Sequence, residues 1–229
     1  MKPLVFFDPV KHIYTDAKGN RLISCSKLIS GLTPPFDPDG KITEKYALKN
    51  GLTVEQVKAQ WKETNKQSCD YGTAIHNEIE YYIKYREVRE SPYSHYVEQF
   101  SKQRYNGRLF SERMLYCLNN MVAGTADLIE LGQGMVNIDD VKTNKKLEKT
   151  STWGNKMLNE VSHLDDCNFN HYQLQLSIYG YLCELKGLKV NRLRVLYFNP
   201  DTKLMEVHIA RYMRDEVIDI FKNKNYLKN

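Results

Sequence analysis

The pattern of apolar and polar positions divides the chain into strand-like, helical and loop segments. Short apolar runs bounded by Gly, Pro, Asn or Asp predict strands. Residues 4–23 predict a hairpin, with strand-like segments at 4–7 and 12–14 and a polar turn at 16–20, after which 21–23 leads out. Three runs at 109–118, 121–131 and 135–143 predict a meander, because Asn119-Asn120 and Gly132-Gln133-Gly134 supply tight turns. A second strand pair is predicted at 192–198 and 204–209.

Apolar positions spaced three or four apart predict the helices. The predicted ranges are 24–32, 42–49, 53–61, 73–88, 91–101, 171–186 and 212–227. Thr53 and Gln56 form a capping box at the start of one helix, and Gly187 ends the helix of 171–186. A proline-rich segment at 34–40 interrupts the chain. Residues 142–149 predict a basic loop, whereas 150–160 have no clear pattern, and a short helix is one interpretation.

The order of these elements predicts an α/β protein. The three-strand meander and the two further strands would form a mixed central sheet with helices flanking it. The N-terminal hairpin and a helical lobe occupy residues 1–70, and the core occupies residues 71–229. We expect one domain over residues 1–229, because a chain of this length can bury a core of its own.

Composition and charge exclude several classes of protein. With 41% hydrophobic and 27% charged residues, the chain is ordinary for a soluble globular protein and unlike collagen, disordered chains or coiled coils. It has no run of about 18 apolar residues, and its N-terminal segment lacks the apolar region of a signal peptide. We therefore expect a cytoplasmic protein with no membrane partner. The net charge of +5 permits a nucleic-acid partner without demonstrating one.

The cysteines argue against two kinds of metal centre. The chain has 5 of them, at positions 25, 69, 117, 167 and 183, and they form no Cys-x-x-Cys pair. A zinc ribbon or an iron–sulfur cluster needs closer spacing. We expect no iron–sulfur cluster and a reducing compartment with buried thiols.

Asp140-Val141-Lys142 is the first candidate for chemistry. Residues two apart on a strand point to the same side, so the carboxylate and the ammonium lie together. A carboxylate can hold a divalent cation while the lysine positions a water. The alternative is a strand-end salt bridge. Two other Asp-x-Lys triplets, beginning at Asp16 and Asp201, fall in predicted turns and are interpreted as solvated.

Asp127 is the second candidate. It ends Gly124-Thr125-Ala126-Asp127 in the preceding strand, and an antiparallel neighbour would bring it near Asp140. Two close carboxylates repel unless a cation lies between them. The alternative is that Asp127 pairs with a lysine such as Lys142. Asp139 precedes Asp140, and the strand register favours Asp140 without settling the choice.

Two helical pairs complete the candidates. His76 and Glu80 are four apart and share a helix face, beside an apolar stripe. They form either a helical hydrogen bond or a place where an imidazole meets a metal. Gln175 and Tyr179 have the same spacing. They could bind phosphates or orient a lysine, or they lie at the edge of the core.

The order of these four motifs is more specific than any one of them. Gly-Thr-x-x-His-x-x-x-Glu precedes Gly-Thr-Ala-Asp, and Asp-x-Lys-Thr and Gln-x-x-x-Tyr follow. Over about residues 70–210, the chain resembles the RecB-like branch of the PD-(D/E)xK nuclease superfamily, especially phage-encoded exonucleases. It is more distantly similar to the mitochondrial genome maintenance exonuclease and lambda exonuclease. The iron–sulfur cysteines of some members are absent.

The resemblance implies a restriction-endonuclease-like fold, with residues 71–229 as the catalytic core. It implies DNA cleavage with one or two Mg²⁺ or Mn²⁺ ions. Lys142 would position or activate the attacking water, and Glu80 would support the helical part of the site. Gln175 and Tyr179 would line the active site and the DNA. The metal ligands that it implies are His76, Asp127, Asp140 and the Val141 carbonyl.

We therefore expect a metal-dependent DNA exonuclease that acts on single strands or duplex ends during phage replication or recombination, in the cytoplasm of a bacterial host. One alternative is a structure-specific or restriction-type endonuclease. Another is a DNA-binding or inhibitor protein of nuclease fold that no longer cuts. The sequence does not indicate an oligomeric state.

The residues around the candidate site add weaker signals for a DNA partner. Lys145, Lys146 and Lys149 could follow a DNA backbone or form a solvated loop. Phe36, Tyr71 and Trp153 are candidates for stacking on a single strand, with core packing as the alternative.

Overall fold

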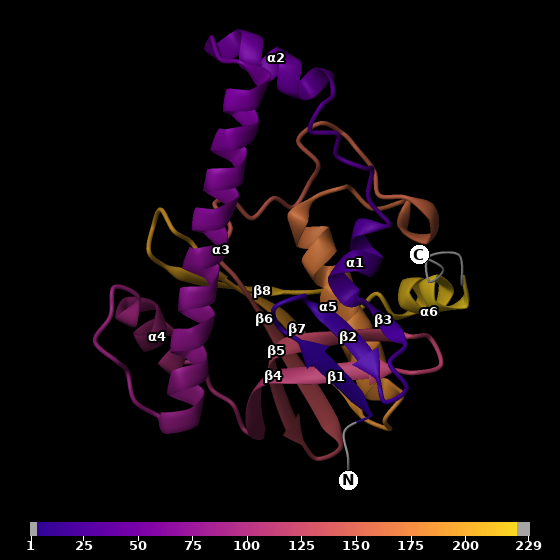
Figure 1. Ribbon diagram of the computed structural model, residues 1–229. Coiled ribbons are helices and arrows are strands. Elements are labelled where there is room, and N and C mark those ends of the chain that lie inside the picture. The colour runs from indigo at the N-terminus through magenta and orange to yellow at the C-terminus, as the bar shows by residue number, and fades with distance from the viewer. Residues whose placement is uncertain (1–3, 224–229) are drawn as a thin grey trace.

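The structure, a computed structural model, describes residues 4–223. The strands are β1 (Val5–Asp8), β2 (Ile13–Asp16), β3 (Arg21–Ser24), β4 (Arg108–Cys117), β5 (Val122–Gly132), β6 (Met135–Lys142), β7 (Lys189–Phe198) and β8 (Met205–Ile209). The helices are α1 (Cys25–Ser30), α2 (Lys41–Asn50), α3 (Val54–Tyr85), α4 (Ser94–Ser101), α5 (Asn168–Glu184) and α6 (Arg214–Lys222), with a 3₁₀ turn η1 (Asn159–Val161) before α5. Figure 1 shows their arrangement.

The strands form one mixed sheet. β4, β5 and β6 are antiparallel neighbours, which confirms the predicted meander. β7 runs parallel to β6 after the crossover through α5, and β8 closes that edge. The N-terminal β1–β2–β3 joins the other side, because β3 pairs with the start of β5. Residues 21–23 thus belong to a third strand rather than a lead-out segment, and the predicted mixed central sheet flanked by helices is confirmed.

One edge of β5 is shared between two strands. β3 pairs with Val122 and Ala123 of β5, whereas the pairs with β6 run from Leu128 to Gly132. Residues 124–127 lie between these two stretches of pairing. The Gly-Thr-Ala-Asp motif therefore falls where the sheet opens on that edge, and Thr125 and Asp127 line a pocket there.

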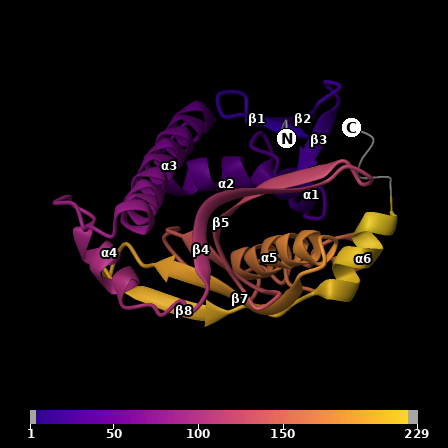
Figure 2. The ribbon, with the colours of Figure 1, turned by 90° about the horizontal axis from the view of Figure 1, so that it is seen from below.

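Helices cover both faces of the sheet. Side chains of α1, α5 and α6 pack with β5, β6 and β7 in the larger apolar cluster. Ile75 and Ile79 of α3, with α4, pack on the opposite face against Leu128, Val141 and Leu196. Figure 2 shows α5 inside the curve of the sheet and α3 and α4 outside it. The alternation of strand side chains decides which of these two layers each polar residue meets.

The helices predicted at 53–61 and 73–88 are one continuous helix, α3, and that prediction was wrong. It begins at the Thr53 capping box and ends at Tyr85, where Arg86 adopts a left-handed φ of 59°. The segment between the two predicted pieces is polar on all sides and lies in solvent, so it has no apolar period to detect. It also contains neither proline nor glycine until Gly72, so nothing in it breaks a helix.

Other boundaries move by a few residues. α4 begins at Ser94 rather than at residue 91, because Ser91 and Tyr93 form a hydrogen-bonded turn before it. In residues 150–160, where a short helix was one interpretation, the structure has only the start of the 3₁₀ turn η1, at Asn159. α6 begins at Arg214, and residues 224–227 of the helix predicted there lie outside the described range. Within residues 4–223, no helix combines the length and apolar character needed to cross a membrane.

Candidate metal centre

Asp127 links the two central strands of the meander. Its Oδ2 atom accepts a 2.7 Å hydrogen bond from the backbone N–H of Val141. The backbone pairing of β5 with β6 ends just before this point, at Leu128 and Asp139. The other oxygen, Oδ1, lies 3.8 Å from Nδ1 of His76 on α3. The predicted proximity of Asp127 to the Asp140-Val141-Lys142 triplet is thus present.

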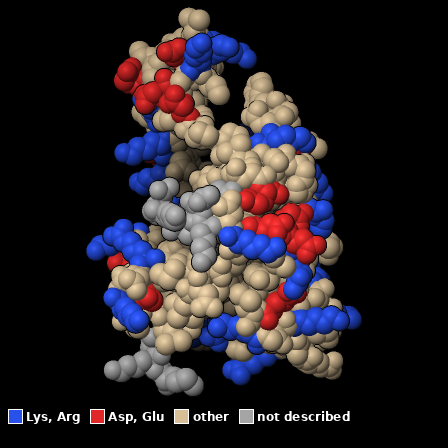
Figure 3. All heavy atoms as spheres, turned by 90° about the vertical axis from the view of Figure 1, so that its right-hand side faces the viewer, with Lys and Arg blue, Asp and Glu red and all other residues tan. Residues whose placement is uncertain are grey.

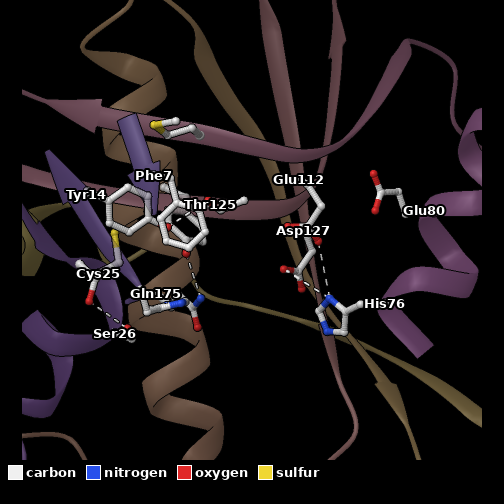
Figure 4. Close-up of a pocket in the computed structure, with 15 residues that line it drawn as sticks. Phe7, Tyr14, Cys25, Ser26, His76, Glu80, Glu112, Thr125, Asp127 and Gln175 are labelled. Atoms are coloured by element: carbon white, nitrogen blue, oxygen red, sulfur yellow. Dashed lines mark hydrogen bonds and ion pairs between the residues drawn. The ribbon is translucent and has the colours of Figure 1, made fainter. Parts of the chain in front are cut away.

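Three side chains from three elements converge at this point. His76, Glu112 and Asp127 each offer a ligand atom within 4.8 Å of those of the other two. Nδ1 of His76 also lies 3.8 Å from the Glu112 carboxylate. Figure 4 shows the three side chains pointing toward one another. Imidazole nitrogen and carboxylate oxygens are a donor set that suits Mn²⁺ and, for the oxygens, Mg²⁺.

Glu112 was missed by the sequence reasoning. Register pairs on either side, Ser111 with Leu128 and Arg113 with Ala126, place it opposite Asp127. Its φ of 48° is left-handed, which is unusual for a glutamate inside a strand. Such backbone costs about 1–3 kcal/mol and is often found at functional sites. The one signal in the sequence is the polar triplet Ser-Glu-Arg interrupting an apolar strand, and only the strand register gives it meaning.

Asp140 and Lys142 form a buried pair beside this cluster. Lys142 Nζ lies 2.6 Å from Oδ2 of Asp140, whose side chain is 1% exposed. The salt bridge that sequence offered as an alternative is therefore present. Oδ1 of Asp140 has no hydrogen-bond partner among the described residues. A buried carboxylate oxygen without a donor is costly, so the local chemistry fits a nearby cation as well as the lysine.

The electrostatics of the pair follow from burial and from Asp127. Burial raises the pKa of Asp140 to about 6; Lys142 opposes that rise, and Asp127 adds to it. Burial alone would lower the pKa of Lys142, but the carboxylates of Asp140 and Asp127 outweigh it and raise the pKa. The ammonium also lies 4.8 Å from the centre of the Tyr172 ring. Lys142 is therefore protonated at neutral pH.

His76 has competing influences of the same kind. Burial lowers its pKa, but the Glu112 carboxylate and the charge of Asp127 outweigh burial and raise the pKa. The imidazole thus takes up a proton more readily than an isolated histidine when no cation is near. A cation held by these ligands would compete with that proton.

Asp139 belongs to the opposite face of β6. Its carboxylate accepts hydrogen bonds from Arg194 Nε at 2.8 Å and Nη2 at 2.6 Å. The hydroxyl of Tyr105 donates a third at 2.7 Å. Both oxygens are satisfied by this network, so the side chain that faces the open end of the sheet is that of Asp140. The register argument for Asp140 over Asp139 agrees with this placement.

Two glycines of the motifs allow close approach of backbones. A Cβ at Gly124 would lie 2.7 Å from the Tyr179 ring and 2.8 Å from the sulfur of Cys25. Only glycine lets α5 lie this near β5 at the open edge. A Cβ at Gly72 would meet Oγ1 of Thr143 at 3.0 Å, so this glycine brings α3 and His76 close to the end of β6.

Gln175 and Tyr179 interact as their spacing predicts. Nε2 of Gln175 donates a 3.0 Å hydrogen bond to the hydroxyl of Tyr179. The tyrosine is 3% exposed, and burial raises its pKa well above the ordinary value. Both side chains line the pocket that also contains Asp127 and His76. They are at once the edge of the core and part of the pocket wall.

The pocket has a volume of about 580 Å³. Figure 4 shows two groups of side chains around it. Tyr14, Thr125 and Gln175 lie together on one side, and the cluster of His76, Glu112 and Asp127 lies on the other. This volume is within the usual range for small-ligand sites, roughly 300–1,000 Å³.

Other predicted residues lie outside the cluster. Glu80 is exposed and lines the pocket, and Figure 4 shows it apart from the three converging side chains. Val141 lines the neighbouring pocket. Lys145, Lys146 and Lys149 are exposed on a loop whose backbone is held by Tyr197 and Asn168. The loop is thus solvated but fixed, and its lysines stay available to a polyanion.

The candidate stacking residues have different surroundings. Trp153 is 86% exposed and Phe36 63% exposed, so neither packs in the core. The Phe36 ring lies 5.7 Å from that of Trp61. The hydroxyls of Tyr71 on α3 and Tyr96 on α4 are 2.8 Å apart, and Tyr71 packs against the core cluster that contains Tyr96. On the face in Figure 3, Lys and Arg side chains are interspersed with Asp and Glu, so that face carries no continuous basic surface.

The comparisons with known proteins give little help with function. No family model matches the chain, and no curated protein matches it in sequence. Among solved structures, the crystal structure of SSO0001 matches over 90% of this chain and 76% of that chain, with 16% sequence identity and a TM-score of 0.43. At that score, the similarity carries no argument about fold or function.

Proposed function

We propose that the chain is a divalent-metal-dependent DNA exonuclease with a restriction-endonuclease-like core of the RecB-like branch. One observation carries the proposal: His76, Glu112 and Asp127 converge beside the buried Asp140–Lys142 pair, where the pairing of β5 with β6 ends. Clustered carboxylates repel phosphate, so a protein that only binds DNA has no use for them at its DNA surface. They become useful when they hold a cation against a phosphate.

The residues have distinct tasks in this proposal. Asp127, His76 and Glu112 would hold the ion, and Val141 fixes the orientation of Asp127 through its N–H. Asp140 interacts electrostatically with Asp127 and His76, so its charge would also favour a cation there. A bound Mg²⁺ or Mn²⁺ supplies charge for the phosphate and acidifies a bound water. Lys142 is protonated, so it would steady a phosphate oxygen or orient a water rather than remove a proton.

The proposed partner is DNA, as single strands or duplex ends. Lys145, Lys146 and Lys149 lie on the loop directly after Lys142, where they could contact backbone phosphates beyond the cluster. We propose the cytoplasm of a phage-infected bacterial host as the place of action. The 5 cysteines are free thiols, which fits a reducing compartment. The prediction that they are buried was wrong for Cys69, which is exposed on the solvent-facing part of α3.

End-labelled linear and closed circular DNA, single- and double-stranded, tests the proposal. Each substrate is incubated with the purified protein in Mg²⁺, Mn²⁺ or EDTA. We expect loss of linear DNA with either metal, survival of closed circles, and no cleavage in EDTA. Nicked circles would instead indicate an endonuclease. Binding without cleavage in any metal would indicate a DNA-binding protein of nuclease fold.

A further inference from the structure

The N-terminal hairpin is fastened to the strand that carries Asp127. The hydroxyl of Tyr14 on β2 lies 3.0 Å from Oγ1 of Thr125, two residues before Asp127. Tyr14 is also buried, in a small apolar cluster with Val5 and Ala123. The hairpin is therefore held in place relative to the proposed metal centre. Side chains on its inner face have a defined position in the same pocket.

Two aromatic rings of this hairpin remain accessible at the pocket. Phe7 stacks on Tyr14 with ring centroids 4.6 Å apart and an angle of 27°. His12 meets Phe7 edge-on, at 5.2 Å and 84°. Both rings line the pocket that also contains Asp127, and His12 borders the neighbouring pocket of Lys142 as well. The buried Tyr14 supports Phe7 from behind, so Phe7 is a rigid rather than a mobile surface.

The His12 ring lies at the pocket although it is not buried in the core. His12 is exposed, and its φ of 53° is left-handed, as strained backbone at binding sites often is. The sequence motifs around His76, Asp127 and Lys142 do not account for either ring. Aromatic faces that are backed, accessible and adjacent to a phosphate site are the usual platform for the bases of a single strand.

We infer that Phe7 and His12 form a base-stacking subsite for the nucleotide next to the phosphate at the metal centre. The inference rests on the proposed function. A phosphate at the cluster of His76, Glu112 and Asp127 would place its neighbouring base across the shared pocket, against the hairpin. Stacking is tolerant of sequence because every base has an aromatic face. The subsite therefore takes single-stranded ends without selecting a base.

A fluorescent base provides a test that does not depend on cleavage. Single-stranded oligonucleotides with 2-aminopurine at the first position from either end are titrated with protein in Ca²⁺, a cation that carboxylate oxygens bind, and fluorescence is recorded. Their cleavage is then measured in Mn²⁺. We expect quenching of one terminal probe by the wild-type protein. Phe7→Leu keeps an apolar side chain on Tyr14 but removes the aromatic face. It should lose that quenching and raise KM about fivefold or more, with little change in kcat.

Two further variants keep the test decisive. Phe6→Leu is the matched control, because Phe6 is 47% exposed on the same strand and does not line the pocket. His12→Ala removes an exposed ring and should reproduce the Phe7→Leu effect without loss of thermal stability. If the wild type cleaves DNA and Phe7→Leu and His12→Ala match it in quenching and KM, the subsite is wrong and the nuclease proposal stands. If the wild type neither quenches nor cleaves, both proposals fall.

Discussion

Oδ2 of Asp127 accepts a 2.7 Å hydrogen bond from the N–H of Val141, at the point where the pairing of β5 and β6 has ended. The carboxylate oxygen accepts the N–H of Val141, as a backbone carbonyl oxygen of β5 would if the pairing of the two strands continued. The bond also turns Oδ1 toward His76, 3.8 Å away. One carboxylate thus joins two strands and faces a third element, so Asp127 is oriented before any ligand arrives. Such pre-orientation is what a metal site requires of its ligands.

Substitutions of the neighbouring Asp139 and Asp140 should have different effects, on stability for Asp139 and on metal binding for Asp140. Asp140→Asn keeps the shape but removes the charge, so we expect Mn²⁺ affinity to fall at least about tenfold and cleavage to be lost. The fold should remain, because Lys142 is partly exposed and keeps the nearby charge of Asp127. Asp139→Asn should keep Mn²⁺ affinity and lose about 3 kcal/mol of unfolding free energy, because Arg194 is left buried without its charge partner. Calorimetric Mn²⁺ titration and urea unfolding of both variants measure the two effects. A loss of Mn²⁺ affinity in Asp139→Asn alone would reverse the assignment.

Glu112 should matter more to metal binding than Glu80. Glu112→Gln removes a charged oxygen from the cluster, and we expect Mn²⁺ affinity to fall about tenfold. Glu80→Gln is the matched control, since Glu80 is exposed and lies outside the cluster. Electron paramagnetic resonance of free Mn²⁺ gives both affinities without DNA or turnover. Equal affinities for Glu112→Gln and wild type would remove Glu112 from the site, and a larger effect of Glu80→Gln would put Glu80 in its place.

Gly124 should be indispensable for the packing of α5 on β5. In Gly124→Ala the new Cβ meets Tyr179 at 2.7 Å and Cys25 at 2.8 Å, both in the buried core. We expect a loss of about 1–3 kcal/mol in unfolding free energy from this overpacking, measured by urea denaturation. Gly31→Ala is the control: its Cβ meets nothing closer than 3.4 Å and its φ of −71° suits alanine, so stability should barely change.

A double variant separates this steric cause from others. Tyr179→Leu removes the ring that Gly124→Ala would strike, so the two changes should be strongly non-additive. The double variant should be more stable than the sum of the single effects implies. Strict additivity would mean that the cost of Gly124→Ala arises elsewhere, for instance at Cys25.

Only part of this fold and site can be predicted from the sequence, because some elements have a local sequence pattern and others depend on tertiary contacts. The meander and α5 have clear apolar periods, and His76, Asp127, Asp140 and Lys142 stand in motifs with fixed spacing. The middle of α3 has no such period, since it lies in solvent. Glu112 has no motif around it; it enters the cluster only through a strand register that sets Ser111 against Leu128. Register depends on tertiary contacts, which a single sequence does not display.

Metal affinity should depend on pH through Asp140 and His76. Burial raises the pKa of Asp140 to about 6, and the nearby carboxylates raise that of His76 above its ordinary value. A group must lose its proton to bind a cation, so raised pKa values move the loss of affinity to higher pH. Affinity should be complete well above these pKa values and fall as pH drops through about 6, by up to about tenfold per pH unit for each proton taken up. Calorimetric Mn²⁺ titrations between about pH 5 and about pH 8 measure this slope. In Asp140→Asn only the contribution of His76 remains, so the slope should be shallower. A wild-type affinity that is constant across this range would show that neither group competes with the metal for a proton.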